Sequence, residues 1–248
     1  VMDNTVFVGS QDANLYAVDT KTGEQQWAFD TGRAILSSPT IADNKVFIGN
    51  QGAGLYAVDI ETGEQQWMFE TSDQVRSSPT VVNGSVLIGS YDGNLYAVNA
   101  ETGEQQWAFE TGDEIFSSPT VVDSAVFIAS RDSNLYSIDT ETGEQQWTFQ
   151  TGDTIDSSPT VANGTVFVGS QDNNVYAVEA DVNGSSDGSR VSLGTLGHHG
   201  DWQYANQSIT ISPSDQDIDT EADESTSSEH DSADSEANKP AGPHSEEA

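Results

Sequence analysis

Residues 14–29 read NLYAVDTKTGEQQWAF, and near-copies of this phrase follow at a fixed interval. The copies are GLYAVDIETGEQQWMF at 54–69, NLYAVNAETGEQQWAF at 94–109 and NLYSIDTETGEQQWTF at 134–149, each 40 residues after the last. A fifth copy begins as NVYAVEA at 174–180 and then loses the phrase. A fixed period of this length is typical of a repeat architecture, in which each repeat is one structural unit.

Each repeat carries four strand signals, which in the second repeat are SSPTIA, KVFIGN, LYAVD and EQQWMF. The second and third are apolar runs, which predicts strands buried on both faces between neighbouring sheets. The fourth alternates, as an outer strand with one packed face does. Pro39 favours an edge position for the first strand, which places it at the inner rim. Four antiparallel strands per repeat predict an all-β fold, a β-propeller of about five four-stranded blades.

The end of the chain departs from this regularity. We assign residues 1–214 to the propeller, with regular repeats over 1–180, a polar insertion over 181–200 and a degraded repeat over 201–214. The stretch SITISPS at 208–214 resembles AILSSPT at 34–40. It could supply a first strand to the first blade and close a five-bladed ring; the alternative is an open fragment of a larger ring. Residues 215–248 are acidic and lack apolar residues other than Ile218 and alanines, so we expect a disordered tail.

The charge of the chain narrows the range of partners. It has 41 acidic and 7 basic residues, a formal net charge of −34, and residues 1–180 alone hold 26 acidic and 5 basic residues. Such a surface repels nucleic acid and anionic membranes, so both are poor partners. It also destabilises a compact state at low salt, whereas at about 1 M salt screening removes most of the repulsion. We therefore expect a protein of a salt-loving organism. No run of about 18 apolar residues suggests a membrane span.

The repeated phrase resembles the repeat of the pyrroloquinoline-quinone (PQQ)-type β-propellers. Residues 17–27, 57–67 and 97–107 look like that family's tryptophan-docking motif A-x-D-x-x-T-G-x-x-x-W, with Asn99 for the aspartate in the third copy and Ser137 for the alanine in the fourth. The repeats lack the Gly-His and Trp-Asp residue pairs that are typical of a WD40 propeller. The resemblance implies that one tryptophan per repeat docks between blades. The repeated glycine fits a turn that needs positive φ. These structural residues are Trp27, Trp67, Trp107, Trp147, Gly23, Gly63, Gly103 and Gly143.

The family resemblance also implies two functional branches. One is quinone-dependent dehydrogenases, which need a larger ring, a calcium ion, an aspartate base and often a vicinal cysteine pair. The other is non-enzymatic scaffolds similar to the outer-membrane assembly lipoprotein of bacteria. This chain has no cysteine and no histidine before His198. Glu24 and its three repeat copies are interpreted as a solvated strand face rather than as acids and bases.

Other candidate ligand groups have simpler interpretations. His198, His199 and Asp201 could hold a metal, but an exposed loop is the preferred interpretation. The aspartate after the second strand, as at Asp12 and Asp92, could bind calcium, but we expect it to cap its turn. We predict no catalytic residue, no metal site and no cofactor; PQQ and calcium belong only to the alternative function.

Positions at which otherwise near-identical repeats differ are the candidates for binding. One set lies just before SSPT and the other in the turn after the second strand, where Gln11, Gln51 and Gln171 also stand. In an antiparallel four-stranded blade these two loops lie at one end, so we expect both sets on one face of the propeller. Arginine, tyrosine and phenylalanine are enriched at binding hot spots; the alternative is neutral drift. The proposed face consists of Leu36, Arg76, Phe116, Asp156, Tyr91 and Arg131.

Together these observations favour a non-catalytic, halophilic β-propeller scaffold outside the cytoplasm, binding a protein or small ligand at this face. The alternative is a quinone-binding protein or a fragment of a quinoprotein dehydrogenase.

Overall fold

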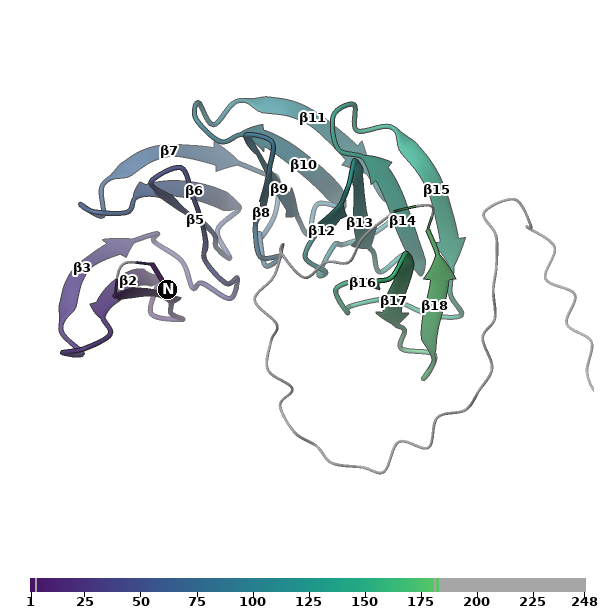
Figure 1. Cartoon of the computed structure of the whole chain (residues 1–248), viewed down its shortest axis with the longest axis horizontal. Helices are drawn as coiled ribbons and strands as arrows, with labels where there is room; N and C mark the ends of the chain where they lie inside the picture. The colour runs from purple at the N-terminus through teal and green to yellow at the C-terminus, as the bar shows by residue number, and fades with distance from the viewer. Residues whose placement is uncertain (3, 181, 183–248) are drawn as a thin grey trace, which may run out of the picture. The chain divides into compact units, whose positions relative to one another are not determined.

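The computed structural model describes residues 1–2, 4–180 and 182, which form five antiparallel sheets standing side by side in chain order (Figure 1). The regular structure in this part of the chain is all β, and it contains no helix that could span a membrane. The insertion over 181–200, the degraded repeat over 201–214 and the expected tail over 215–248 lie outside the described residues, apart from Val182. The all-β, propeller-like architecture predicted from the repeats is confirmed.

The three middle blades have four strands each, and the first and last have three described strands. The first blade holds β1 (Thr5–Gly9), β2 (Asn14–Asp19) and β3 (Gln25–Asp30). The second holds β4 (Thr40–Ala42), β5 (Lys45–Gly49), β6 (Gly54–Asp59) and β7 (Gln65–Glu70). The third holds β8 (Thr80–Val82), β9 (Ser85–Gly89), β10 (Asn94–Asn99) and β11 (Gln105–Glu110). The fourth holds β12 (Thr120–Val122), β13 (Ala125–Ala129), β14 (Asn134–Asp139) and β15 (Gln145–Gln150), and the fifth holds β16 (Thr160–Ala162), β17 (Thr165–Gly169) and β18 (Val175–Glu179).

The first strand of each repeat is shorter than its sequence suggested and lies innermost. In the second blade it begins at Thr40 rather than Ser37, because Pro39 cannot donate a ladder hydrogen bond. Successive first strands lie next to one another: Thr40 Oγ1 donates to the Pro79 carbonyl at 2.6 Å, and the Ser38 amide donates to Ser78 Oγ at 2.9 Å. The same pair of bonds recurs between later blades, which confirms the inner-rim position of this strand.

The described sheet of the first blade consists of β1, β2 and β3 and has no first strand of the repeat, as the sequence indicated. Met2 forms an isolated antiparallel bridge with Thr5. This pairing matches Ala42 with Lys45 in the second blade, so Met2 takes the position of the last residue of a first strand.

The hydrophobic core is divided among the seams between blades. Four clusters of buried residues are present, and each joins one face of a blade to the opposite face of the next. Between the first two blades, for example, Phe7 and Leu15 pack against Ile48 and Val58. Apolar residues on both faces of the second and third strands are therefore buried in the middle blades, as the apolar runs predicted.

The repeated tryptophan forms a hydrogen bond from one blade to the next at three seams. The indole N–H of Trp27 donates to the Ile60 carbonyl in the next blade at 3.1 Å, and Trp67 and Trp107 make the equivalent bonds 40 and 80 residues later. The ring lies against the turn glycine of that next blade: a Cβ added to Gly63 would lie 2.7 Å from Trp27. Gly63 has a φ of +74°, so glycine is required there both by the backbone and by the indole. The indoles of Trp27, Trp67 and Trp107 thus each bond to the next blade, at three seams.

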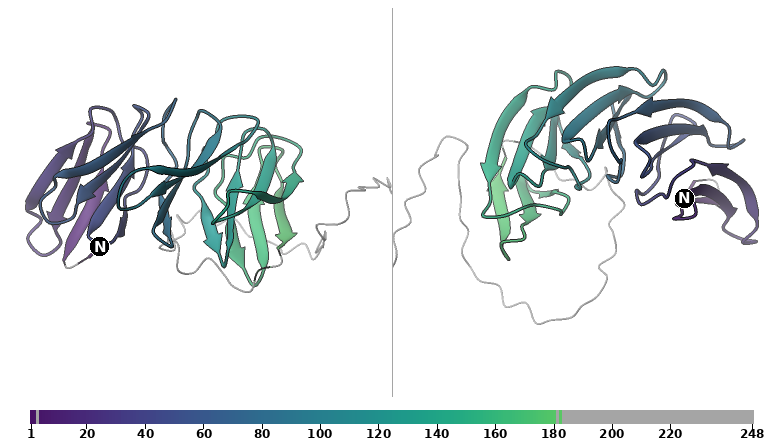
Figure 2. Two further views of the ribbon diagram at one scale, coloured as in Figure 1. Left: turned by 90° about the horizontal axis from the view of Figure 1, so that it is seen from above. Right: turned by 180° about the vertical axis from the view of Figure 1, so that it is seen from behind.

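The sheets do not close into a ring within the described residues. Figure 2 shows the first and fifth blades at the two ends of the row of sheets. Apolar residues are exposed on their outer faces, including Val8 at 47%, Phe167 at 39% and Val175 at 73%. The strand expected to close a five-bladed ring, over 208–214, lies outside the described residues.

Candidate functional site

The two sets of variable positions meet on one rim of the propeller. The turn after the second strand of each blade bonds to the loop that precedes its first strand. In the third blade the Tyr91 amide donates to the Gln74 carbonyl at 2.9 Å, and in the fourth the Arg131 amide donates to the Glu114 carbonyl at 3.0 Å. This pairing repeats in the second and fifth blades. The prediction that the two loops share one face is therefore correct for these blades.

The side chains at these positions form one continuous row, which we call the rim row. It crosses three seams by alternating between the two sets of positions. Its members, in order of contact, are Gln51, Arg76, Tyr91, Phe116, Arg131, Asp156 and Gln171.

The centre of the rim row is an aromatic pair held between two arginines. The rings of Tyr91 and Phe116 lie 4.2 Å apart between centroids, inclined by 30°. The guanidinium carbon of Arg131 lies 3.8 Å from the centroid of Phe116, and that of Arg76 lies 4.7 Å from Tyr91. Cation–π contacts of this kind order otherwise mobile arginine side chains, so the four residues form a preformed surface.

Polar contacts hold both ends of the row. Arg131 Nε donates to Asp156 Oδ1 at 3.0 Å and its Nη1 donates to Glu114 Oε2 at 3.2 Å, while Gln171 Nε2 donates to Asp156 Oδ2 at 2.7 Å. At the other end, the Gln51 amide oxygen accepts from Arg76 Nη2 at 2.9 Å when the amide is oriented with its oxygen toward the arginine.

The electrostatics of the row follow from these contacts. The pKa of Arg131 is raised because Asp156 accepts its hydrogen bond. Burial raises the pKa of the Tyr91 hydroxyl, whose oxygen is buried and has no hydrogen-bond partner among the described residues. Two of the chain's seven basic residues thus lie in this row, next to two carboxylates.

One predicted site residue stands apart from the row, and one partner was missed. Leu36 occupies the equivalent position in the second blade and is 43% exposed, but the contacts that define the rim row begin at Gln51. Glu114, which pairs with Arg131, was not singled out from the sequence. A signal was present, because the position two residues before the variable one also differs between repeats, as Ala34, Gln74, Glu114 and Thr154.

The turn aspartates cap their own turns, as expected. Asp132 Oδ1 accepts from the Asn134 amide at 2.9 Å, and its Oδ2 accepts from the Tyr136 hydroxyl and from the Gly112 amide at 2.7 Å. In the second blade, where Gly52 interrupts the series, Asn50 Oδ1 accepts from the amides of Gly52 and Gly54 instead. The hydrogen bond from Tyr176 is the main cause that lowers the pKa of Asp172, the equivalent carboxyl in the fifth blade.

The aspartates of the docking motif cap the turns at the other rim of the propeller. Asp59 Oδ1 accepts from the Glu61 and Thr62 amides, and the Thr62 amide is the main cause that lowers the pKa of Asp59. Asn99 accepts the same two bonds in the third blade, which explains why an amide can replace the carboxylate there. Among the described residues, no group of three or more histidine, cysteine, aspartate or glutamate side chains could hold a metal ion.

Comparison with known proteins supports the propeller fold. A family model described as "Beta-alanine-activating enzyme, beta-propeller" matches residues 1–195. The chain belongs to this β-propeller family. No curated protein matches this member of the family in sequence.

Solved structures share the fold of this family member. BamB from Moraxella catarrhalis superposes with a TM-score of 0.66 at 24% identity, covering 73% of this chain and 60% of that one. The computationally designed Ika8 protein superposes with a TM-score of 0.65 at 18% identity, covering 71% of this chain and 56% of that one. The chain thus spans less than two thirds of the length of either structure, and at these identities the likeness concerns the fold alone.

Proposed function

We propose that this propeller is a non-catalytic scaffold that binds a protein partner through the rim row. The observation that carries the proposal is the Arg76–Tyr91–Phe116–Arg131 stack, which is built from positions where the repeats differ. At the docking turns, by contrast, the repeats keep the tryptophan and the glycine for one structural task. Arginine and aromatic side chains anchor protein interfaces, and ordering them before binding lowers the entropy lost on association.

The electrostatic setting favours a partner protein with basic residues around an apolar or aromatic centre. The net charge of −34 opposes nucleic acid and anionic membranes. Within the row, Glu114 and Asp156 flank Arg131 and would accept hydrogen bonds from such a partner. The proposal also includes a location outside the cytoplasm and a salt-rich environment. The location rests on the family resemblance, and the salt-rich environment rests on the acidic charge of the chain.

Cross-linking followed by mass spectrometry tests the interaction. The full chain is incubated with an extract of its own organism and cross-linked, and the partner's contact sites are mapped. We expect contacts on the rim row and their loss, with at least about tenfold weaker capture, in the triple variant Arg76→Ala, Phe116→Ala, Arg131→Ala. The matched control is Glu64→Ala, Glu104→Ala, Glu144→Ala on the exposed outer strands. Capture of the same partner that survives the rim variant would remove the proposal.

The salt-rich environment is tested by unfolding the protein in low and in molar salt. We expect stability to rise with salt because screening relieves carboxylate repulsion. Equal stability in both would contradict a halophilic protein.

The alternative function, quinone binding, lacks support in the described residues. Calcium takes six to eight oxygen ligands, and no cluster of this kind is present among them. Adding PQQ with calcium and recording absorbance and melting temperature separates the two functions; a saturable change in either would favour the quinone-binding alternative.

A further inference from the structure

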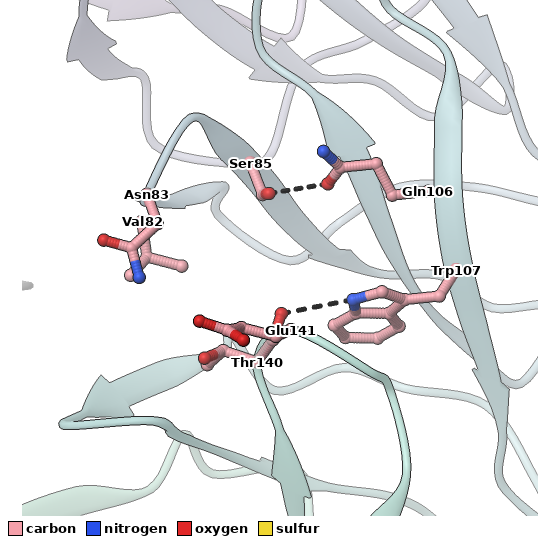
Figure 3. Close-up of a pocket in the computed structure, with 7 residues that line it drawn as sticks. All are labelled: Val82, Asn83, Ser85, Gln106, Trp107, Thr140 and Glu141. Atoms are coloured by element: carbon pink, nitrogen blue, oxygen red, sulfur yellow. Dashed lines mark hydrogen bonds between the residues drawn. The ribbon is translucent and has the colours of Figure 1, made fainter.

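A polar recess recurs at the outer end of the seams between blades. Between the third and fourth blades it has a volume of about 310 Å³ (Figure 3). Its walls come from the end of β8, the start of β9, strand β11 and the docking turn of the next blade. The lining residues are Val82, Asn83, Ser85, Gln106, Trp107, Thr140 and Glu141.

A second recess of about 310 Å³ lies at the same repeat positions between the first and second blades. Thr5, Gln26 and Glu61 line it, each 80 residues before Ser85, Gln106 and Glu141. The hydroxyl at the first position donates to the glutamine in both: Ser85 Oγ to Gln106 Oε1 at 2.6 Å, and Thr5 Oγ1 to Gln26 Oε1 at 3.0 Å. The recess is therefore a product of the repeat.

The seam between the second and third blades shows what this recess can hold. Lys45 stands there at the repeat position of Thr5 and Ser85. Its Nζ donates to Glu101, the repeat equivalent of Glu61 and Glu141, although the lysine side chain is only 12% exposed. At this seam the chain thus places its own alkylammonium group beside the turn glutamate, with a lysine side chain that is 12% exposed and a glutamate side chain that is 78% exposed.

The recesses between the first and second blades and between the third and fourth blades have the turn glutamate but no lysine. Glu61 and Glu141 form no ion pair within the part of the chain that the structure describes. Thr140 in the third–fourth recess is 5% exposed, and its Oγ1 is buried without a hydrogen-bond partner among the described residues. The Trp107 indole lies along the wall, with its N–H directed to the Thr140 carbonyl at 3.2 Å.

We propose that the recesses at Glu61 and Glu141 bind a primary alkylammonium group. The group pairs with the glutamate as Lys45 does with Glu101, and its three N–H donors are shared between the glutamate and the neighbouring side-chain oxygens. A lysine side chain of a partner protein and a free alkylamine offer the same chemistry. This inference does not depend on the rim row, which lies at different positions of the repeat.

Nuclear magnetic resonance of the indole N–H groups reads each recess separately. The ¹⁵N-labelled chain is titrated with n-butylammonium chloride at constant ionic strength, and in a second arm with a lysine whose two backbone ends are blocked. We expect saturable shifts of the Trp27 and Trp107 signals, while Trp67, at the seam where Lys45 pairs with Glu101, does not respond. Tighter binding of the blocked lysine than of butylammonium identifies a protein side chain as the natural ligand; equal or weaker binding identifies a free amine.

Three variants and one control variant make the test decisive. Ser85→Lys should abolish the Trp107 response and leave that of Trp27, whereas Lys45→Ser should give Trp67 a response. Glu141→Gln should weaken binding at Trp107 about tenfold or more, because a charged hydrogen-bond acceptor is lost. Glu104→Gln, an exposed glutamate outside the recess, should change nothing. Equal shifts of Trp67, Trp27 and Trp107 in the unaltered protein, or an unchanged affinity in Glu141→Gln, would overturn the proposal.

Discussion

The middle blades and the end blades share one sequence pattern but present different surfaces. Ile48 is fully buried at the seam between the first and second blades, whereas its repeat equivalent Val8 on the outer face of the first blade is 47% exposed. Leu55 is fully buried, whereas its equivalent Val175 in the fifth blade is 73% exposed. A blade therefore cannot bury both faces by itself, and the stability of each repeat comes largely from its neighbours.

The docking turn shows the same contrast in finer detail. Gly63, Gly103 and Gly143 each lie against the tryptophan of the preceding blade. Gly23 has the same conformation, with a φ of +72°, but a Cβ added there meets no atom within 4 Å among the described residues. The first blade thus carries a formed turn without the indole that the turn receives elsewhere. Equivalent positions with and without a neighbour allow the seam contacts to be measured apart from the turn itself.

The largest effect is expected from removing one docked indole. Trp107→Ala should lower the free energy of unfolding by about 3–5 kcal/mol, because a large aromatic side chain is lost and a cavity is left at the seam. Denaturant unfolding followed by circular dichroism measures it. Met68→Ala, which truncates a side chain that is 41% exposed in β7, should cost far less. Unchanged stability in the tryptophan variant would refute the docking role.

An intermediate effect is expected from the turn glycines. Gly103→Ala should cost about 2–4 kcal/mol, because alanine is strained at positive φ and its Cβ would lie 2.8 Å from Trp67. Gly23→Ala should cost about 1–2 kcal/mol, the backbone strain alone. Melting temperatures and denaturant midpoints of the two variants give the difference, which isolates the indole contact. Equal costs would mean that the indole moves aside freely.

The smallest effect is expected from a hydrogen-bonded serine that is buried in one blade and exposed in another. Ser77 Oγ donates to the Gly89 carbonyl and accepts from the Gly89 amide, both at 2.8 Å, and the side chain is fully buried. Ser157 makes the same two bonds to Gly169 at 2.9 Å but is exposed. Ser77→Ala should cost about 1–3 kcal/mol, since a buried amide loses its partner, and Ser157→Ala about 0.5 kcal/mol.

Chemical denaturation of both serine variants, with Ser77→Thr as a control that keeps the hydroxyl, provides the measurement. A larger loss in Ser157→Ala than in Ser77→Ala would show that exposure does not set the value of this bond.

Much of the fold could be predicted because it is local. A hairpin turn forms at Asn83-Gly84, a residue pair that favours such turns, with φ values of 47° and 77°. The docking motif predicted both the turn glycine and the tryptophan that reaches the next blade. Because the repeats recur at a fixed spacing, the strand and turn assignment made for one repeat applied to all the regular repeats.

The candidate site was predicted in part. Its face and most of its members followed from the variable positions, because antiparallel pairing places the two loops at one end. The order of contacts did not follow, since Phe116 meets Tyr91 and Arg131 only through the angle between blades. The Lys45–Glu101 pair could also not be predicted from the sequence, because its partners are 56 residues apart and belong to neighbouring sheets.

The sequence by itself determined the unit: four strands, their turns, the indole and the glycine that receives an indole. These depend on residues close in the chain and on a strict period, which local backbone preferences and side-chain alternation express directly. Only the tertiary structure decided which copies of a residue are buried, which glycine turn holds an indole and which seam contains a lysine–glutamate ion pair. Those outcomes depend on the blade standing alongside, and identical repeats give no information about where the row of neighbours stops.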